Sequence, residues 1–202
     1  MDKLRAGIKR FQSETFAPNR ERYERLATSQ FPYALFITCG DSRVQPEVLT
    51  QSGPGEIFVE RNPGNIVPAF GAADPGGVSA SIEFAISVLH VSEIVICGHS
   101  DCGAMKAVLN PGAAAHLNAV NSWLRYAKPA YERNREELAK LTAPAQLKRL
   151  IELNVVEQLR NLKTHPCVIA NPQLNLHGWS YEIHSGKVSA LDAQTGRFEA
   201  LV

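Results

Sequence analysis

The chain has 202 residues, of which 45% are hydrophobic and 20% are charged, and its formal net charge is +1. This is the mixture of an ordinary globular protein, and a chain of this length buries enough surface to fold without a disulfide or a structural metal. A net charge near zero gives no electrostatic reason to expect nucleic acid or an anionic membrane as a partner, and we predict neither.

The first thirty residues predict a helical arm made of two short helices, with a break at Ala17-Pro18-Asn19. Leu4, Ile8 and Phe11 follow the i, i+4, i+7 spacing of an apolar helix stripe. The segment lacks the apolar core of a signal peptide, and the chain contains no apolar run of about 18 residues that would span a bilayer. We therefore expect a cytoplasmic protein whose cysteines stay reduced.

Short apolar runs that end abruptly in turn residues predict strands buried on both faces of a sheet. Between them, small and apolar residues predict helices, and prolines mark helix starts or interruptions. The predicted strands are 33–38, 56–61 and 93–98, and the predicted helices begin at Pro46, cover 78–90, begin again at Gly103 and fill most of 113–163, with interruptions at Pro129 and Pro144.

The alternation of strands and helices predicts an α/β fold. We expect a mostly parallel central β-sheet of about four parallel strands plus an antiparallel edge strand, flanked by helices. The tail, 174–202, alternates like one strand followed by a hairpin around Ser185-Gly186. No repeat or linker divides the chain, so we expect one domain over residues 1–202, with residues 1–30 as its arm.

Two motifs point to metal chemistry: Cys-x-Asp-x-Arg at 39–43 and His-x-x-Cys at 99–102. Zinc favours thiolate and imidazole, and a catalytic zinc site usually keeps three protein ligands and one open position. Cys39 and His99 both fall at the predicted carboxyl ends of strands, where sites form in parallel sheets. We therefore predict one zinc ion held by Cys39, His99 and Cys102.

Taken singly, these residues also have structural explanations. A cysteine is often a small core residue, Asp41 could cap a turn, and Arg43 could be a surface residue. Their coincidence at two matching strand ends favours the metal site. Cys97 is assigned to core packing rather than to a fourth ligand.

The motifs Cys39-Gly-Asp-Ser-Arg43 and His99-Ser-Asp-Cys102 resemble the signature of the β-class carbonic anhydrases. The chain looks closest to the bacterial branch encoded beside cyanase, which shares the plant enzymes' subtype. Further matches extend the resemblance from about residue 4 to 198: Pro54-Gly-Glu-Ile-Phe58, Arg61-Asn-Pro-Gly-Asn65, Gly76-Gly-Val-Ser-Ala80, Ile82-Glu-Phe84, Val95-Ile-Cys-Gly-His99 and His177-Gly-Trp179.

The resemblance implies a lyase that reversibly hydrates carbon dioxide to bicarbonate and a proton, by attack of zinc-bound hydroxide, with one Zn²⁺ per subunit. Two thiolates and one imidazole cancel the charge of the ion, so activation of water needs help from beyond the ligands. The resemblance assigns this help to Asp41, which orients the hydroxide and is kept ionised by Arg43. It also implies a closed resting state in which Asp41 becomes the fourth ligand.

The family pattern assigns the pocket for carbon dioxide to Gln30, Phe58, Phe84 and the backbone of Gly103. In this family a partner subunit supplies some of these groups, so the resemblance implies a homodimer, or a tetramer or octamer built from dimers. Plain core packing explains Phe58 and Phe84 about as well as a substrate contact does. Phe84 stands where plant relatives have Tyr, which removes a hydroxyl from the pocket.

Two other functions remain open from the sequence. One is a hydrolase that acts on carbon disulfide or carbonyl sulfide at the same zinc site. The other is a non-catalytic scaffold in which Asp41 permanently fills the fourth zinc position. Arg43 argues against the scaffold, because it gives Asp41 a partner other than the metal.

Overall fold

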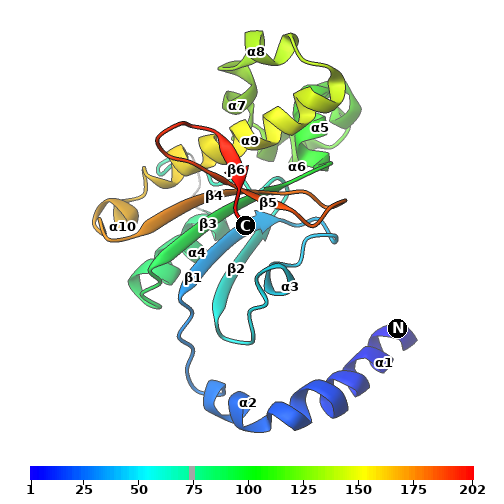
Figure 1. The fold of residues 1–202 in the computed structure, drawn as a ribbon, viewed down its shortest axis with the longest axis vertical. Helices are drawn as coiled ribbons and strands as arrows, with labels where there is room; N and C mark the ends of the chain where they lie inside the picture. Colours follow the sequence, from blue (N-terminus) through cyan, green and yellow to red (C-terminus); the bar gives the residue numbers. More distant parts are fainter. Residues whose placement is uncertain (73–75) are drawn as a thin grey trace.

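The computed structural model describes residues 1–72 and 76–202 (Figure 1). Its centre is a six-stranded sheet of order β2-β1-β3-β4-β5-β6. The first four of these strands pair in parallel, and β5 and β6 continue the sheet as antiparallel strands at one edge. The predicted α/β class is therefore confirmed. The strands are β1 (Ala34–Cys39), β2 (Ile57–Asn62), β3 (Glu93–His99), β4 (Asn175–Tyr181), β5 (Val188–Leu191) and β6 (Phe198–Ala200).

The helices of the body follow the predicted pattern, with more divisions than expected after residue 113. Pro129 and Pro144 both lie in the first turn of a helix, where a missing backbone donor costs little. The short α10 and β6 were not predicted, because such brief elements show no periodicity. These helices are α3 (Pro46–Thr50), α4 (Gly76–Ser87), α5 (Gly103–Leu109), α6 (Asn118–Leu124), α7 (Lys128–Glu132), α8 (Arg135–Ala139), α9 (Ala143–Leu162) and α10 (Pro166–Ile169).

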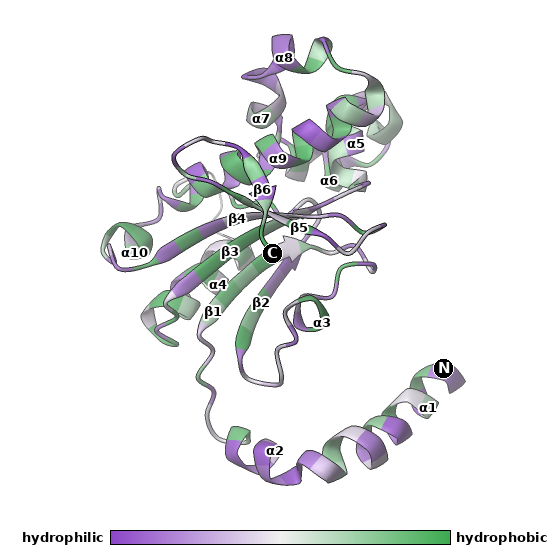
Figure 2. Cartoon of the chain, viewed as in Figure 1, coloured by the Kyte–Doolittle hydropathy of each residue, from purple (hydrophilic) through white to green (hydrophobic). Residues whose placement is uncertain are grey.

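Hydrophobic packing on both faces of the sheet fixes the central strands. Leu35 and Ile37 of β1 are fully buried, in one cluster with residues of β3, α4 and α9. On the other face, Phe36 packs edge-to-face on Trp179 with 5.8 Å between ring centroids, and Cys97 is fully buried beside them. Figure 2 shows β1 and β3 largely in the hydrophobic colour. The carboxyl ends of these two strands are thereby held side by side.

The N-terminal arm is helical from Asp2 to Leu26, and at the predicted break, Ala17-Pro18-Asn19, the α-helix gives way to a 3₁₀ turn without ending the helical path (Figure 1). A π-helical turn, Phe11–Phe16, and a 3₁₀ turn, Ala17–Asn19, join α1 (Asp2–Arg10) to α2 (Arg20–Leu26). Proline removes a single backbone donor, and the Asn19 side chain donates to the carbonyl of Thr15 at 2.8 Å, which satisfies one carbonyl of this turn.

The arm extends away from the sheet (Figure 1), and the side chains of its apolar stripe are exposed. Leu4 is 68% exposed and Ile8 is 58% exposed. The arm joins the body where Arg22 pairs with Glu56. Within the described residues, no helix has the length and hydropathy needed to cross a membrane.

Candidate metal centre

The three predicted ligands converge at the carboxyl ends of β1 and β3. Cys39 ends β1, His99 ends β3, and Cys102 immediately precedes α5. The parallel pairing of β1 with β3 brings these ends to one edge of the sheet. The two sulfur atoms and a ring nitrogen lie within 4.8 Å of one another, and all three side chains are buried. This arrangement can hold one metal ion through three ligand atoms.

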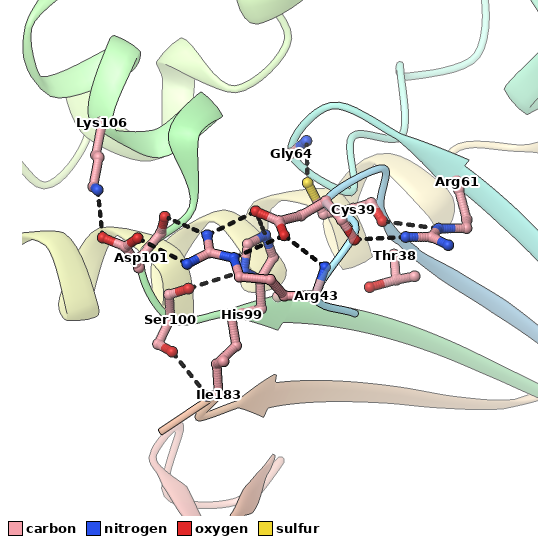
Figure 3. A network of polar contacts seen from close by, with 12 residues as sticks. Thr38, Cys39, Arg43, Arg61, Gly64, His99, Ser100, Asp101, Lys106 and Ile183 are labelled. Atoms are coloured by element: carbon pink, nitrogen blue, oxygen red, sulfur yellow. Dashed lines mark hydrogen bonds and ion pairs between the residues drawn. The ribbon is translucent and has the colours of Figure 1, made fainter. Parts of the chain in front are cut away.

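The imidazole of His99 is oriented for metal binding. Its Nδ1 lies 2.9 Å from the carbonyl oxygen of Ser100, a contact in which Nδ1 carries the proton and donates (Figure 3). In the neutral imidazole the other nitrogen, Nε2, is then the acceptor, and it is buried without a hydrogen-bond partner. A buried acceptor without a partner is costly. A cation bound between His99 and the two thiols would satisfy it, so these residues fit a zinc ion.

The thiols of Cys39 and Cys102 contact each other, and this contact shifts their pKa values in opposite directions. The hydrogen bond from Cys102 lowers the pKa of Cys39 to about 4, despite the opposing effect of burial. The same contact, together with burial, raises the pKa of Cys102. Backbone N–H groups of Ala104 and Met105, at the start of α5, donate to Cys102. Cys39 is thus the more acidic of the two thiols, and a bound cation would favour the ionised form of both.

The loop after β2 supports the Cys39 thiolate. Gly64 donates its N–H to the sulfur of Cys39 at 3.4 Å (Figure 3). Its φ is +85°, and a Cβ at this position would lie 2.9 Å from the Cβ of Ala104. Asn154 on α9 donates to the Gly64 carbonyl at 3.0 Å and so attaches the loop to α9. Only glycine fits this position without displacing α5 or the loop.

Asp41 lies beside the ligands and accepts several hydrogen bonds from Arg43. Its Oδ1 accepts bonds from the Arg43 backbone N–H and from Nε, both at 2.9 Å, and its Oδ2 accepts from Nη2 at 2.8 Å. These bonds hold the pKa of Asp41 well below its usual range. Its Oδ2 lies 4.0 Å from Nε2 of His99. An ionised carboxylate oxygen therefore faces the metal centre with one acceptor position left.

Two supports of this pair were not identified from the sequence. Arg61 donates to the carbonyl oxygens of Cys39 at 3.1 Å and of Asp41 at 2.7 Å, and so holds the turn after β1. Asp101 accepts a bond from Nη1 of Arg43 at 3.0 Å and also contacts Lys106 (Figure 3). The sequence signals for these roles were only an arginine before an Asn-Pro-Gly-Asn turn and an acidic residue between two ligands.

Of the four predicted pocket residues, only Gly103 lies at this centre, where it begins α5 next to Cys102. Phe58 precedes the carboxyl end of β2 by four residues, about 13 Å along the strand. It packs against Phe84, with 6.0 Å between ring centroids. Gln30 is exposed in the segment before β1. Within one chain these three residues are therefore not brought to the metal centre.

A buried Cys-His-Cys centre at the carboxyl edge of a mostly parallel sheet defines a metal-binding α/β protein. The Carbonic anhydrase family profile matches residues 34–188. The chain is 50% identical over 198 residues to a carbonic anhydrase of Pseudomonas aeruginosa, covering 96% of this chain and 89% of that protein. It is 46% identical over 204 residues to carbonic anhydrase 1 of Escherichia coli O157:H7, covering 100% and 92%.

Solved structures of β-carbonic anhydrases also match the chain. The β-carbonic anhydrase CcaA matches with a TM-score of 0.97 at 37% identity, covering 100% of this chain and 92% of that chain. The Coccomyxa β-carbonic anhydrase in complex with acetazolamide matches with a TM-score of 0.84 at 33% identity, covering 94% and 85%. The chain belongs to the β-class carbonic anhydrases. It is thus a carbonate dehydratase, a lyase that hydrates carbon dioxide, which the comparisons favour over the hydrolase and the scaffold.

Proposed function

We propose that Cys39, His99 and Cys102 hold one zinc ion, and that Asp41, fixed by Arg43, orients the water that reacts with carbon dioxide. The observation that carries this proposal is the position of the ionised Asp41 carboxylate, whose Oδ2 lies 4.0 Å from the unpartnered Nε2 of His99. Two thiolates and an imidazole are the ligand set that zinc prefers. The buried site also excludes bulk water from the ligands.

Zinc bound there would act as a Lewis acid that lowers the pKa of water. Two thiolates weaken that effect, because they cancel the charge of the ion. Side chains beyond the ligands must therefore contribute more to the activation of water than they do around a zinc ion with neutral ligands. Ionised Asp41 can only accept hydrogen bonds. Its remaining lone pair can take the hydrogen of a water molecule and thereby direct the oxygen lone pair of that water at carbon dioxide.

Arg43 has two roles in this proposal. It keeps Asp41 ionised, and its paired N–H groups fix the plane of the carboxylate. The free lone pair on Oδ2 of Asp41 is also the one that would bind the ion in a closed resting state. Water and the metal therefore compete for the same atom.

We propose that the active form is a homodimer in which Gln30, Phe58 and Phe84 of one subunit line the pocket of the other. Their distance from the metal centre of their own chain supports this arrangement. The exposed stripe of Leu4 and Ile8 on the projecting arm also supports it, because exposed apolar side chains in a row favour contact with a partner surface. Two β-carbonic anhydrases of Sordaria macrospora, one of them 31% identical with a TM-score of 0.74, are described as tetrameric, which supports further pairing of dimers.

We also infer the plant-type subtype and the bacterial branch encoded beside cyanase, on the motifs quoted above. A cyanase gene next to the gene for this chain would support that branch. The free thiols, two of which are proposed zinc ligands, suit a reducing cytoplasm.

Metal removal tests the proposal. The purified protein should hold about one zinc per chain, as expected for a three-ligand catalytic site. Stripping the metal with a chelator should abolish carbon dioxide hydration, and added zinc, but not magnesium, should restore it. Full hydration by the stripped protein, or restoration by magnesium, would contradict the proposal.

A further inference from the structure

We propose that Asp101 is a positioning residue for the hydration reaction: it binds a second edge of the Arg43 guanidinium, so that Arg43 stays hydrogen-bonded to Asp41. This inference rests on the role proposed above for the Asp41–Arg43 pair. It goes beyond that role because it adds a residue that touches neither the ligand atoms nor Asp41.

The contacts of Arg43 use two adjacent edges of its guanidinium, which share Nη2. On one edge, Nε and Nη2 donate to the carboxylate of Asp41. On the other edge, Nη1 donates to Oδ2 of Asp101 at 3.0 Å, and Nη2 reaches the Asp101 carbonyl oxygen at 3.4 Å (Figure 3). The guanidinium therefore cannot turn away from Asp41 without breaking its bonds to Asp101.

A single ion pair would not hold Arg43 in place. Its side chain is 44% exposed, and exposed pairs of long side chains are weak because fixing them costs rotamer entropy. Two carboxylates on adjacent edges of one planar guanidinium restrict its rotation more than one does. Asp101 supplies the second carboxylate.

The backbone at Asp101 indicates that its side chain is needed there. Its φ is +61°, in the left-handed region that glycine adopts without cost. An aspartate at this position accepts some backbone strain. In this conformation both its carbonyl oxygen and its carboxylate reach Arg43. Because Asp101 lies between the ligands His99 and Cys102, its contact with Arg43 is made from the loop that carries these two ligands.

Lys106 completes the arrangement from α5. Its ammonium group contacts Oδ1 of Asp101, which leaves Oδ2 for Arg43 (Figure 3). Asp41, Arg43, Asp101 and Lys106 thus form a chain of alternating charge that runs from the turn after β1 to the first turns of α5. The chain connects the two sequence motifs through side chains as well as through the metal.

A double-mutant cycle tests the inference on the zinc-loaded full chain. Asp101→Gly keeps the positive φ and removes the carboxylate, whereas Asp101→Asn is the conservative variant that keeps one acceptor oxygen. We expect Asp101→Gly to lower kcat/KM for carbon dioxide about tenfold, as for other residues that orient a metal-site group, and Asp101→Asn to lower it less. In an Arg43→Met background, Asp101→Gly should cause no further loss.

Two readouts separate positioning from damage to the loop. Zinc affinity, measured by chelator competition, should be the same for wild type and Asp101→Gly. The Nε–H signal of Arg43 in arginine-labelled protein, assigned with Arg43→Met, should be protected from exchange in wild type and exposed in Asp101→Gly. Wild-type kcat/KM for Asp101→Gly, an equal loss in the Arg43→Met background, or weakened zinc binding would each overturn the inference. Wild-type activity of Arg43→Met alone would instead overturn the proposed role of the Asp41–Arg43 pair.

Discussion

Oδ2 of Asp41 lies 4.0 Å from Nε2 of His99, although Asp41 follows β1 and His99 ends β3. The histidine nitrogen is buried without a partner, and the carboxylate is held ionised by Arg43 on its other side. A metal ligand and an acceptor for water therefore stand next to each other in one centre. This relationship underlies the mechanism proposed for the chain.

Replacing Cys102 should remove the metal. Cys102→Ala leaves one thiol and one imidazole, which are too few ligands for a stable zinc site. We expect bound zinc to fall from about one per chain to near zero, and hydration to fall with it. The matched control is Cys167→Ala, because Cys167 is a half-buried free thiol outside the metal group. A Cys102→Ala protein with a full complement of zinc would contradict the ligand assignment.

Replacing Gly64 should cost both stability and metal affinity. Gly64→Ala forces an alanine to a φ of +85° and brings its Cβ to 2.9 Å from the Cβ of Ala104. We expect the backbone to cost about 1 kcal/mol and the overlap about 1–3 kcal/mol more. Denaturant unfolding and zinc competition measure the two effects.

Gly186→Ala is the control for that experiment. Gly186 has a φ of +72°, but nothing lies within 4 Å of a Cβ built there. It should therefore show the backbone cost alone and keep wild-type zinc affinity. Equal losses of stability in the two variants would show that the close approach of Gly64 to α5 is unimportant.

Subunit mixing tests whether the pocket is shared. Gln30→Ala chains keep an intact metal centre, whereas Asp41→Asn chains keep an intact Gln30. If Gln30 serves the partner's centre, a mixed dimer contains one complete site. Co-refolding the two variants should then give more hydration activity than the sum of the two parents. Strictly additive activity would indicate that each chain builds its own pocket, or that Gln30 plays no part.

The junction of the arm should depend on pH through Glu56. The N–H of Gly53 and then the Arg22 side chain lower the pKa of Glu56 from its ordinary value of 4.5. A lowered pKa contributes stability that is complete above the unfolded-state value and is lost as pH falls through the folded-state value. The difference in Tm between wild type and Glu56→Gln should thus be present at neutral pH and shrink below about pH 4.5.

Acid release of zinc affects both of those proteins and cancels in the difference between them. A Tm difference that stays constant down to about pH 3, well below the ordinary range of a glutamate, would exclude a role for the Glu56 charge.

Much of the fold could be predicted from the chain because its signals are local. Apolar runs that end at turn residues define the parallel strands, and the motif residues fall at their carboxyl ends. The short β6 is too brief for a periodic pattern. The break expected at Ala17-Pro18-Asn19 is a 3₁₀ turn and not an end of the helical path, because the Asn19 side chain donates a hydrogen bond within the same turn.

The site was predictable only in part, because some of its contacts are not local in sequence. Ligand identity follows from residue type and spacing, so the sequence alone was enough to select Cys39, His99 and Cys102. The bond from Arg43 to Asp101 joins residues 58 positions apart, and the fit of Gly64 depends on where α5 lies. Such contacts depend on how loops pack in three dimensions, and no local pattern encodes them.

The most direct test of the account is Asp41→Asn, with bound zinc and carbon dioxide hydration measured on the same sample. Asparagine keeps the size of the side chain but removes the charge that Arg43 stabilises. We predict a full complement of zinc, because Asp41 is not one of the three ligands, and a loss of hydration of about 10–100-fold. A zinc-loaded Asp41→Asn protein that hydrates carbon dioxide at the wild-type rate would contradict the account.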